Sequence, residues 1–203
     1  MAEITIDAKK ELILKTARKL LAKNGFAKTT LDDIANALGM KKSSLYYYYS
    51  NKDSLLEDTM DQEEKYFCSL VESELNKANT TINKIINYEK VKFEYVQETL
   101  KLHELSASII LEVKSKLIEH IKRIHKKEFE ILKSVLDESV KKKEIKKCDT
   151  QKVAELILTI SEALRHREFY FASFTVGKTI DFSNAIEEMI FAIKLIFDGL
   201  AIK

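Results

Sequence analysis

Proline is absent from this chain of 203 residues, and glycine occurs only four times. Turn-rich β folds depend on these two residues, and both are unfavourable inside helices, so their scarcity favours an all-α fold. The glycines are Gly25, Gly39, Gly177 and Gly199. Each follows a segment with apolar residues at helical spacing, where a helix commonly ends in a left-handed residue.

Basic residues are enriched at the N-terminal end of the chain. Residues 1–54 contain ten Lys/Arg and six Asp/Glu, whereas the remainder contains 24 and 26. A basic N-terminal part suits an anionic partner such as nucleic acid, but chance variation on a solvated surface explains the same excess. The charge alone leaves both interpretations open.

The chain carries no pattern typical of secretion, membrane insertion or metal binding. Cys68 and Cys148 are too few for a disulfide framework or a CxxC zinc site. No signal peptide pattern occurs, and no apolar run approaches the roughly 20 residues that span a bilayer. We therefore expect a soluble, cytoplasmic protein with no membrane contact, no cofactor and no metal site.

The segment from Thr29 to Lys52 predicts two short helices joined by a tight turn. Thr30 and Asp33 have the spacing of a capping box, and Gly39 permits a sharp turn. In the helix that follows, Leu45 and Tyr49 lie four residues apart and give an inward face. This is the pattern of a helix-turn-helix, whose second helix enters the major groove of DNA.

The outer side and the start of that second helix carry groups that bind nucleic acid. They are Lys42, Ser43, Ser44, Tyr46 and Tyr47. Ammonium, hydroxyl and phenol groups suit phosphate oxygens and base edges, and the free amides of helix starts near Thr30 and Lys52 suit phosphates. The alternative is that the tyrosines complete a core and the lysines are merely solvated.

A longer pattern surrounds this segment. It consists of Leu20-Leu21, Gly25-Phe26, Thr29-Thr30, Asp33-Ile34-Ala35, Leu38-Gly39-Met40, Leu45-Tyr46-Tyr47 and Asn51-Lys52-Asp53-Ser54-Leu55-Leu56. With these residues, the stretch from about 9 to 56 resembles the DNA-binding domain of the TetR family of bacterial repressors. The resemblance implies eight DNA-facing residues: Thr30, Lys42, Ser43, Ser44, Tyr46, Tyr47, Tyr48 and Lys52.

Three residues depart from the pattern of that family. Lys41 stands where many members have a capping serine, so this cap must come from the backbone or water. Tyr49 replaces a common phenylalanine, and its hydroxyl needs a partner. Leu31 stands where some relatives carry a base-reading arginine.

We expect two domains: a three-helix DNA-binding domain over residues 1–54, and a helical bundle over residues 55–203 for ligand binding and dimerisation. A helix from Asn51 to about Leu75 would connect them. Further helices are expected over residues 82–100 and 105–113, from 117 to the basic run at 141–143, and over 153–175 and 183–198.

The last two helices are apolar around much of their circumference, which indicates a second helical partner. Two such helices from each subunit would form a closed, two-fold dimer, although burial inside a monomer is the alternative. The resemblance implies the same homodimer, a palindromic operator in double-stranded DNA, and repression relieved by a small-molecule effector. Such an effector would act by changing the spacing of the two reading helices, about 34–36 Å apart on one turn of DNA.

Residues that contact an effector are harder to predict. Four polar residues, Glu89, His125, Glu128 and Arg167, interrupt apolar helix faces. A polar group on such a face needs a partner, which is either a ligand or another side chain or water. Four apolar residues, Phe67, Phe93, Ile110 and Phe129, are candidates either for ligand contact or for the core.

An enzyme is not expected. The sequence contains no GxGxxG, Walker loop, HExxH or GxSxG motif, and no histidine has a Glu three residues before it. His120 and His125 lie five residues apart, off one helical face. Two further functions stay open: binding of another protein by the tyrosine-rich helix, and binding of DNA without sequence preference.

Overall fold

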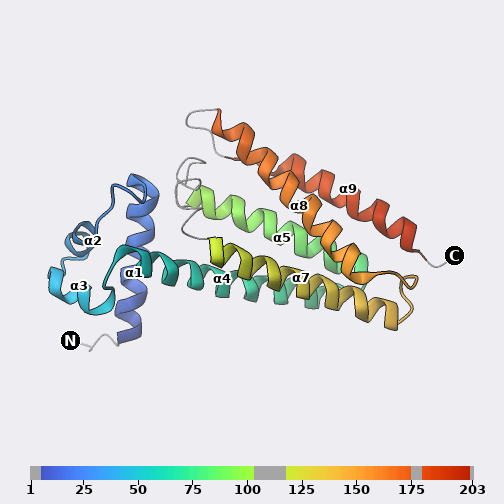
Figure 1. Ribbon diagram of the computed structural model, residues 1–203, viewed down its shortest axis with the longest axis horizontal. Helices are drawn as coiled ribbons and strands as arrows, with labels where there is room; N and C mark the ends of the chain where they lie inside the picture. Colours follow the sequence, from blue (N-terminus) through green and yellow to red (C-terminus); the bar gives the residue numbers. More distant parts are fainter. Residues whose placement is uncertain (1–5, 103–117, 175–179, 202–203) are drawn as a thin grey trace. The chain divides into compact units, whose positions relative to one another are not determined.

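The structure, a computed structural model, describes residues 6–102, 118–174 and 180–201 (Figure 1). Within these ranges the chain forms eight helices and no strand, which confirms the predicted all-α fold. The helices are α1 (Ile6–Asn24), α2 (Leu31–Ala37), α3 (Lys42–Tyr48), α4 (Lys52–Lys77), α5 (Thr81–Leu102), α7 (Ile118–Lys141), α8 (Thr150–Ser173) and α9 (Ser183–Leu200). None of these eight is long and apolar enough to cross a membrane.

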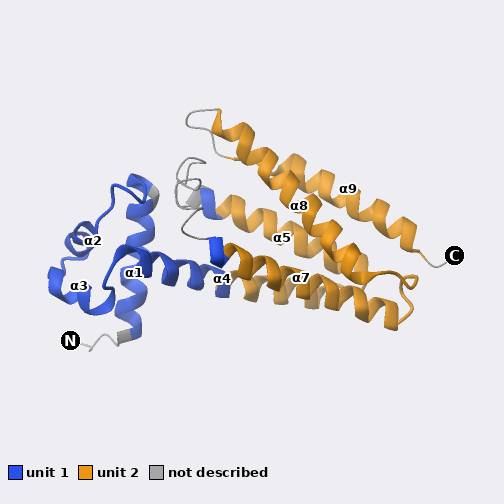
Figure 2. Ribbon diagram, in the orientation of Figure 1, with its two compact units in different colours: residues 1–65, 99–120 blue, residues 66–98, 121–203 orange. Residues whose placement is uncertain are grey.

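The chain divides into two compact units (Figure 2). Unit 1 comprises residues 1–65 and 99–120, and unit 2 comprises residues 66–98 and 121–203. The division therefore falls inside α4, α5 and α7. Unit 1 contains all of the predicted DNA-binding domain, and the predicted boundary after residue 54 stays a prediction.

The N-terminal helices of unit 1 share one apolar core. Its buried residues are Ile13, Leu14 and Ala17 of α1, Leu31, Ile34 and Ala35 of α2, Leu45 of α3, Tyr49, and Leu55 of α4. Helix α2 contacts both α1 and α3. Helices of seven residues are unstable alone, so α2 and α3 depend on this core for their stability.

Local signals define the ends of these helices. Thr30 and Asp33 form the predicted capping box of α2, and the amide of Ser54 donates to Oδ1 of Asn51 at the start of α4 (2.8 Å). Gly25 and Gly39 have positive φ angles of 82° and 64°, as expected for left-handed residues.

The same expectation is wrong for Gly199, which lies inside α9. That helix continues to Leu200, whose carbonyl accepts a hydrogen bond from the amide of Lys146 (2.9 Å). The bond satisfies one of the carbonyls that a left-handed cap would otherwise serve. Gly177 lies outside the described residues.

Unit 2 has a core of aromatic and aliphatic side chains. The ring of Phe182 packs edge-on against Phe93 of α5 and Phe169 of α8, with centroids 5.7 and 5.8 Å apart. Helix α8 contacts α9, which buries Met189 and Ile193. The helix expected over residues 105–113 lies outside the described residues.

Candidate nucleic-acid interface

Helix α3 exposes the groups that the sequence analysis assigned to DNA. Lys42, Ser43 and Ser44 are exposed, and Tyr46 and Tyr47 are 43% and 78% exposed. Leu45 is fully buried. We call Lys42, Ser43, Ser44, Tyr46 and Tyr47 the α3 surface; it combines one cation with four hydroxyl groups.

Lys42 is oriented by its neighbours within this surface. Its Nζ atom lies 2.6 Å from Oδ2 of Asp32 in α2 and 5.6 Å from the ring centroid of Tyr46. The hydrogen bond to Asp32 raises the pKa of Lys42, so the ammonium is fully charged at neutral pH. Both side chains are solvent-exposed, so such a pair is weak and can exchange Asp32 for a phosphate.

Tyr48 lies at the edge of the α3 surface. Its side chain is half-buried and packs against the core, and its ring meets that of Tyr47 edge-on at 5.4 Å. Tyr48 therefore supports the orientation of Tyr47. A direct contact of Tyr48 with DNA stays a prediction.

Thr30 and Lys52 hold the turn before α2. The Thr30 hydroxyl donates to Oδ2 of Asp33 (2.6 Å) and accepts from its amide (3.1 Å). The Lys52 ammonium donates to the carbonyls of Phe26 and of Thr29, the latter at 2.8 Å. An ammonium has three donor protons, so these bonds use two of them. The role of each side chain in phosphate binding stays a prediction.

Tyr49 ties the end of α3 to its neighbours. Its hydroxyl donates to Oδ2 of Asp58 in α4 (3.1 Å), and the same oxygen lies 2.6 Å from Nζ of Lys10 in α1. Burial, followed by the bond to Asp58, raises the pKa of Tyr49 well above its ordinary value. This is the partner that the extra hydroxyl was expected to need. At the other end of α3, the cap residue Lys41 makes no side-chain capping bond, also as expected.

Two of the predicted effector residues meet in a buried polar cluster of unit 2. Glu89 of α5 and Glu128 of α7 are 1% and 5% exposed. Nζ of Lys92 lies 3.6 Å from Glu89 Oε2 and 3.1 Å from Glu128 Oε1. The Tyr88 hydroxyl donates to Glu128 Oε1 (2.9 Å), and the Ser161 hydroxyl donates to Glu89 Oε2 (2.6 Å). These five residues form the buried cluster.

Tyr88, Lys92 and Ser161 are not among the effector residues predicted from the sequence. A signal existed for two of them, because Lys92 lies three residues after Glu89 and four after Tyr88, at the spacings that bring side chains together on a helix. Ser161 lies 72 residues from Glu89, and no sequence spacing indicates that pairing.

The remaining effector candidates lie in different surroundings. Phe93 is fully buried in the core, and Phe67 and Phe129 are half-buried. His125 is exposed, with Nε2 lying 3.4 Å from Glu162. Arg167 pairs with Glu168 and Glu188, each at 2.7 Å. Ile110 lies outside the described residues.

Within unit 1, the short helices α2 and α3 follow α1, and α3 buries Leu45 and exposes its opposite side. This arrangement defines the class of protein, a helix-turn-helix DNA-binding protein, and unit 2 adds further helices to it. Residues 13–59 match the family of bacterial regulatory proteins described as the tetR family. The DNA-binding domain of this chain therefore belongs to the tetR family of bacterial regulatory proteins.

Known proteins with similar sequences or structures support this assignment. The chain is 32% identical over 87 residues to the biofilm operon icaADBC negative transcriptional regulator IcaR of Staphylococcus aureus. That match covers 43% of this chain and 45% of IcaR, so the chain spans under half the length of this relative.

Two solved structures share the fold over nearly the whole chain. A transcriptional regulator from Cytophaga hutchinsonii superimposes with a TM-score of 0.80 at 24% identity, covering 97% of this chain and 100% of the other. The fatty acid degradation regulator FadR of Bacillus halodurans gives a TM-score of 0.71 at 19% identity, covering 91% and 94%. At these identities the likeness concerns the fold.

Proposed function

We propose that this chain is a cytoplasmic, sequence-specific repressor that binds a palindromic operator as a homodimer and is released by a small-molecule effector. The α3 surface carries this proposal, because its polar groups face solvent while Leu45 and Tyr49 anchor the helix below. Repression is supported by the negative regulator IcaR, to which this chain is similar over 87 residues.

The residues of the interface take different roles. Lys42, Ser43 and Ser44 lie at the start of α3 and bind phosphate oxygens or base edges, whereas Tyr46 and Tyr47 reach base edges or the sugar-phosphate backbone. Thr30, Tyr48 and Lys52 flank this surface. Thr30 and Lys52 fix the turn and the helix starts that seat phosphates.

Helices α8 and α9 support the homodimer, because they expose large apolar side chains. Half of the twelve large apolar residues exposed in the described ranges belong to these two helices or end α8. They are Leu156, Tyr170, Phe171, Phe174, Phe191 and Leu195, which we call the α8–α9 apolar surface. Solvent-exposed aromatic residues grouped in this way are typical of protein interfaces.

The spacing along α9 indicates a helical partner. Ala185, Met189, Ile193 and Phe197 are buried at intervals of four residues. Phe191 and Leu195 repeat with the same interval on the opposite side of the helix and are 63% and 55% exposed. One apolar strip of α9 is buried within unit 2, whereas the other is exposed and can pack against a second helix. A second copy of the chain supplies that helix.

The buried cluster supports an effector site in unit 2. Oε1 of Glu89 has no hydrogen-bond partner among the described residues, although the side chain is buried. Burial raises the pKa of Glu89, while Lys92 opposes this shift. A buried carboxyl oxygen of this kind favours a ligand that supplies a polar group. His125, Arg167, Phe67, Phe93, Ile110 and Phe129 stay candidates for further contacts.

Selection of bound fragments from a random DNA pool tests the proposed function. We expect a palindromic consensus, since a two-fold dimer presents two copies of α3 to two equivalent half-sites. Enrichment without a consensus would indicate binding without sequence preference. No enrichment at all would favour a protein partner for α3 and overturn the proposal.

A further inference from the structure

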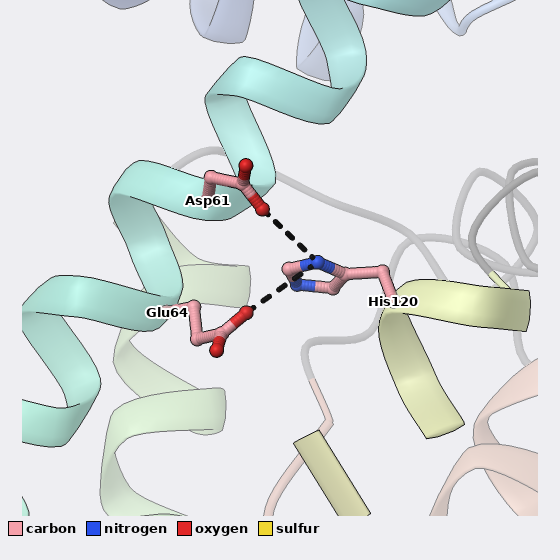
Figure 3. Close-up of side chains that lie close together, drawn as sticks. All are labelled: Asp61, Glu64 and His120. Atoms are coloured by element: carbon pink, nitrogen blue, oxygen red, sulfur yellow. Dashed lines mark ion pairs between the residues drawn. The ribbon is translucent and has the colours of Figure 1, made fainter. Parts of the chain in front are cut away.

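Three side chains with metal-binding groups converge within unit 1 (Figure 3). Asp61 and Glu64 lie about one turn apart in α4, and His120 lies in the first turn of α7. Nδ1 of His120 is 3.5 Å from Oδ1 of Asp61 and 3.6 Å from Oε2 of Glu64. One ligand atom from each of the three residues lies within 4.8 Å of the other two.

The burial of this cluster makes its charge balance important. Glu64 and His120 are each 8% exposed, whereas the side chain of Asp61 is 49% exposed. Glu64 is buried beside a second carboxylate, that of Asp61, and a positive charge between the two stabilises their ionised forms. A protonated imidazole supplies one such charge, and a divalent cation supplies two. The exposed side of Asp61 gives a cation access from solvent.

The distances favour a cation over a direct ion pair. A charge-assisted N–H···O bond between imidazolium and carboxylate is about 2.7–2.9 Å long. Both distances from His120 Nδ1 exceed this range. With metal–ligand bonds of about 2.0–2.2 Å, neighbouring ligands of a tetrahedral ion lie about 3.3–3.5 Å apart. The two separations from His120 Nδ1, 3.5 and 3.6 Å, are close to these values.

The donor set selects the class of cation. One imidazole nitrogen and two carboxylate oxygens suit Zn²⁺ and related transition-metal dications, whereas Mg²⁺ and Ca²⁺ prefer oxygen ligands alone. Three protein ligands leave a coordination position for water or another small ligand. No metal site is expected from the sequence, because His120 has no ligand spacing with another histidine and follows Glu64 by 56 residues.

The same turn of α4 also holds the first helix of the DNA-binding domain. Arg18 of α1 donates to the side chains of Gln62 (3.0 Å) and Glu63. Gln62 and Glu63 thus contact α1, while Asp61 and Glu64, their direct neighbours, face α7. A cation that draws His120 toward this turn would therefore act on α1 through Arg18.

The geometry points to a transition-metal site formed by Asp61, Glu64 and His120, through which a divalent cation regulates DNA binding. The site itself rests on the ligand geometry alone. Its regulatory effect rests on the proposed function and makes the cation an effector or a co-effector of the regulator.

Titration of the untagged full chain with Zn²⁺, Co²⁺ and Mg²⁺, followed by calorimetry and by the visible absorption of Co²⁺, tests the site without DNA. We expect one Zn²⁺ or Co²⁺ bound per chain, with no comparable binding of Mg²⁺. Asp61→Asn and His120→Gln should each weaken binding at least tenfold. Asp61→Asn should fold normally, because the side chain of Asp61 is half exposed, so its loss of metal binding reports on the site itself. His166→Gln is the control, since His166 is an exposed histidine of α8 outside this cluster.

Unchanged metal affinity in both variants, or a Co²⁺–thiolate band from Cys68 or Cys148, would overturn the site. Operator binding is then measured with and without Zn²⁺. We expect a change of at least fivefold in wild type and His166→Gln, and none in Asp61→Asn. Metal binding without this change would overturn the regulatory effect, whereas failure of DNA selection in every metal state would overturn the proposed function and leave the site intact.

Discussion

At the scale of single residues, exposure separates the tyrosines of α3 into different roles. Tyr49 is 3% exposed and Tyr47 is 78% exposed, although they lie only two residues apart. A run of four tyrosines necessarily points in all directions around a helix, and the neighbours Leu45 and Leu55 determine which of them enters the core.

Tyr47→Ala should therefore weaken operator binding by about 1–3 kcal/mol if the phenol contacts a base. The free energy of unfolding should change little, because the side chain is mostly exposed. Fluorescence anisotropy with labelled operator gives the affinity, and Tyr66→Ala, 57% exposed on α4, is the control. Full operator affinity in Tyr47→Ala would remove Tyr47 from the interface.

Lys52→Met should affect both stability and DNA binding. The substitution keeps an unbranched apolar side chain over Phe26 and removes the bonds to the carbonyls of Phe26 and Thr29. Hydrogen bonds to a charged group contribute about 1.5–3 kcal/mol, so chemical denaturation should detect a loss of that order. If the third proton binds a phosphate, the slope of log affinity against log salt should become shallower by about one. An unchanged slope would restrict Lys52 to a structural role.

At the scale of helices, the capping box decides whether α2 forms. Thr30→Ala removes the hydroxyl that accepts from the amide of Asp33 and donates to its carboxylate. We expect a loss of about 1 kcal/mol in the free energy of unfolding. Operator affinity should also fall, because α2 positions α3 through their shared core.

The effect of Thr30→Ala should depend on pH. Bonds from the hydroxyl and the amide of Thr30 lower the pKa of Asp33 in the folded state. A lowered carboxyl pKa contributes stability above the unfolded-state pKa, and this contribution is lost as the pH falls through the lowered value. The difference between wild type and Thr30→Ala should thus be largest above about pH 5 and shrink below about pH 4. Thermal melts across this range measure it, and a difference that grows in acid would contradict the assignment.

At the scale of the whole molecule, the α8–α9 apolar surface should determine the oligomeric state. Phe171→Glu and Phe191→Glu each place a charge on this surface. We expect light scattering to give twice the chain mass of 23.4 kDa for wild type and the single mass for these variants. Operator affinity should fall at least tenfold, because one half-site is lost, while helix content stays constant. Tyr66→Glu is the control, and a dimer that survives both substitutions would exclude this surface.

Sequence patterns with short range predicted much of what the structure contains. The capping box at Thr30, the left-handed Gly39, and the inward pair Leu45 and Tyr49 all depend on residues at most four positions apart. Backbone geometry alone relates such neighbours, so the helix-turn-helix and its exposed side could be inferred without knowledge of the tertiary fold.

The sequence could not predict pairings between distant segments. Lys52 bonds to carbonyls more than 20 residues earlier, Ser161 reaches Glu89 across 72 residues, and His120 meets Asp61 and Glu64 across two helices. Each pairing depends on how whole helices pack, and a helix face has several packing solutions of similar energy. Local spacing thus determined the elements and the class of protein, whereas tertiary packing decided which charged side chains meet.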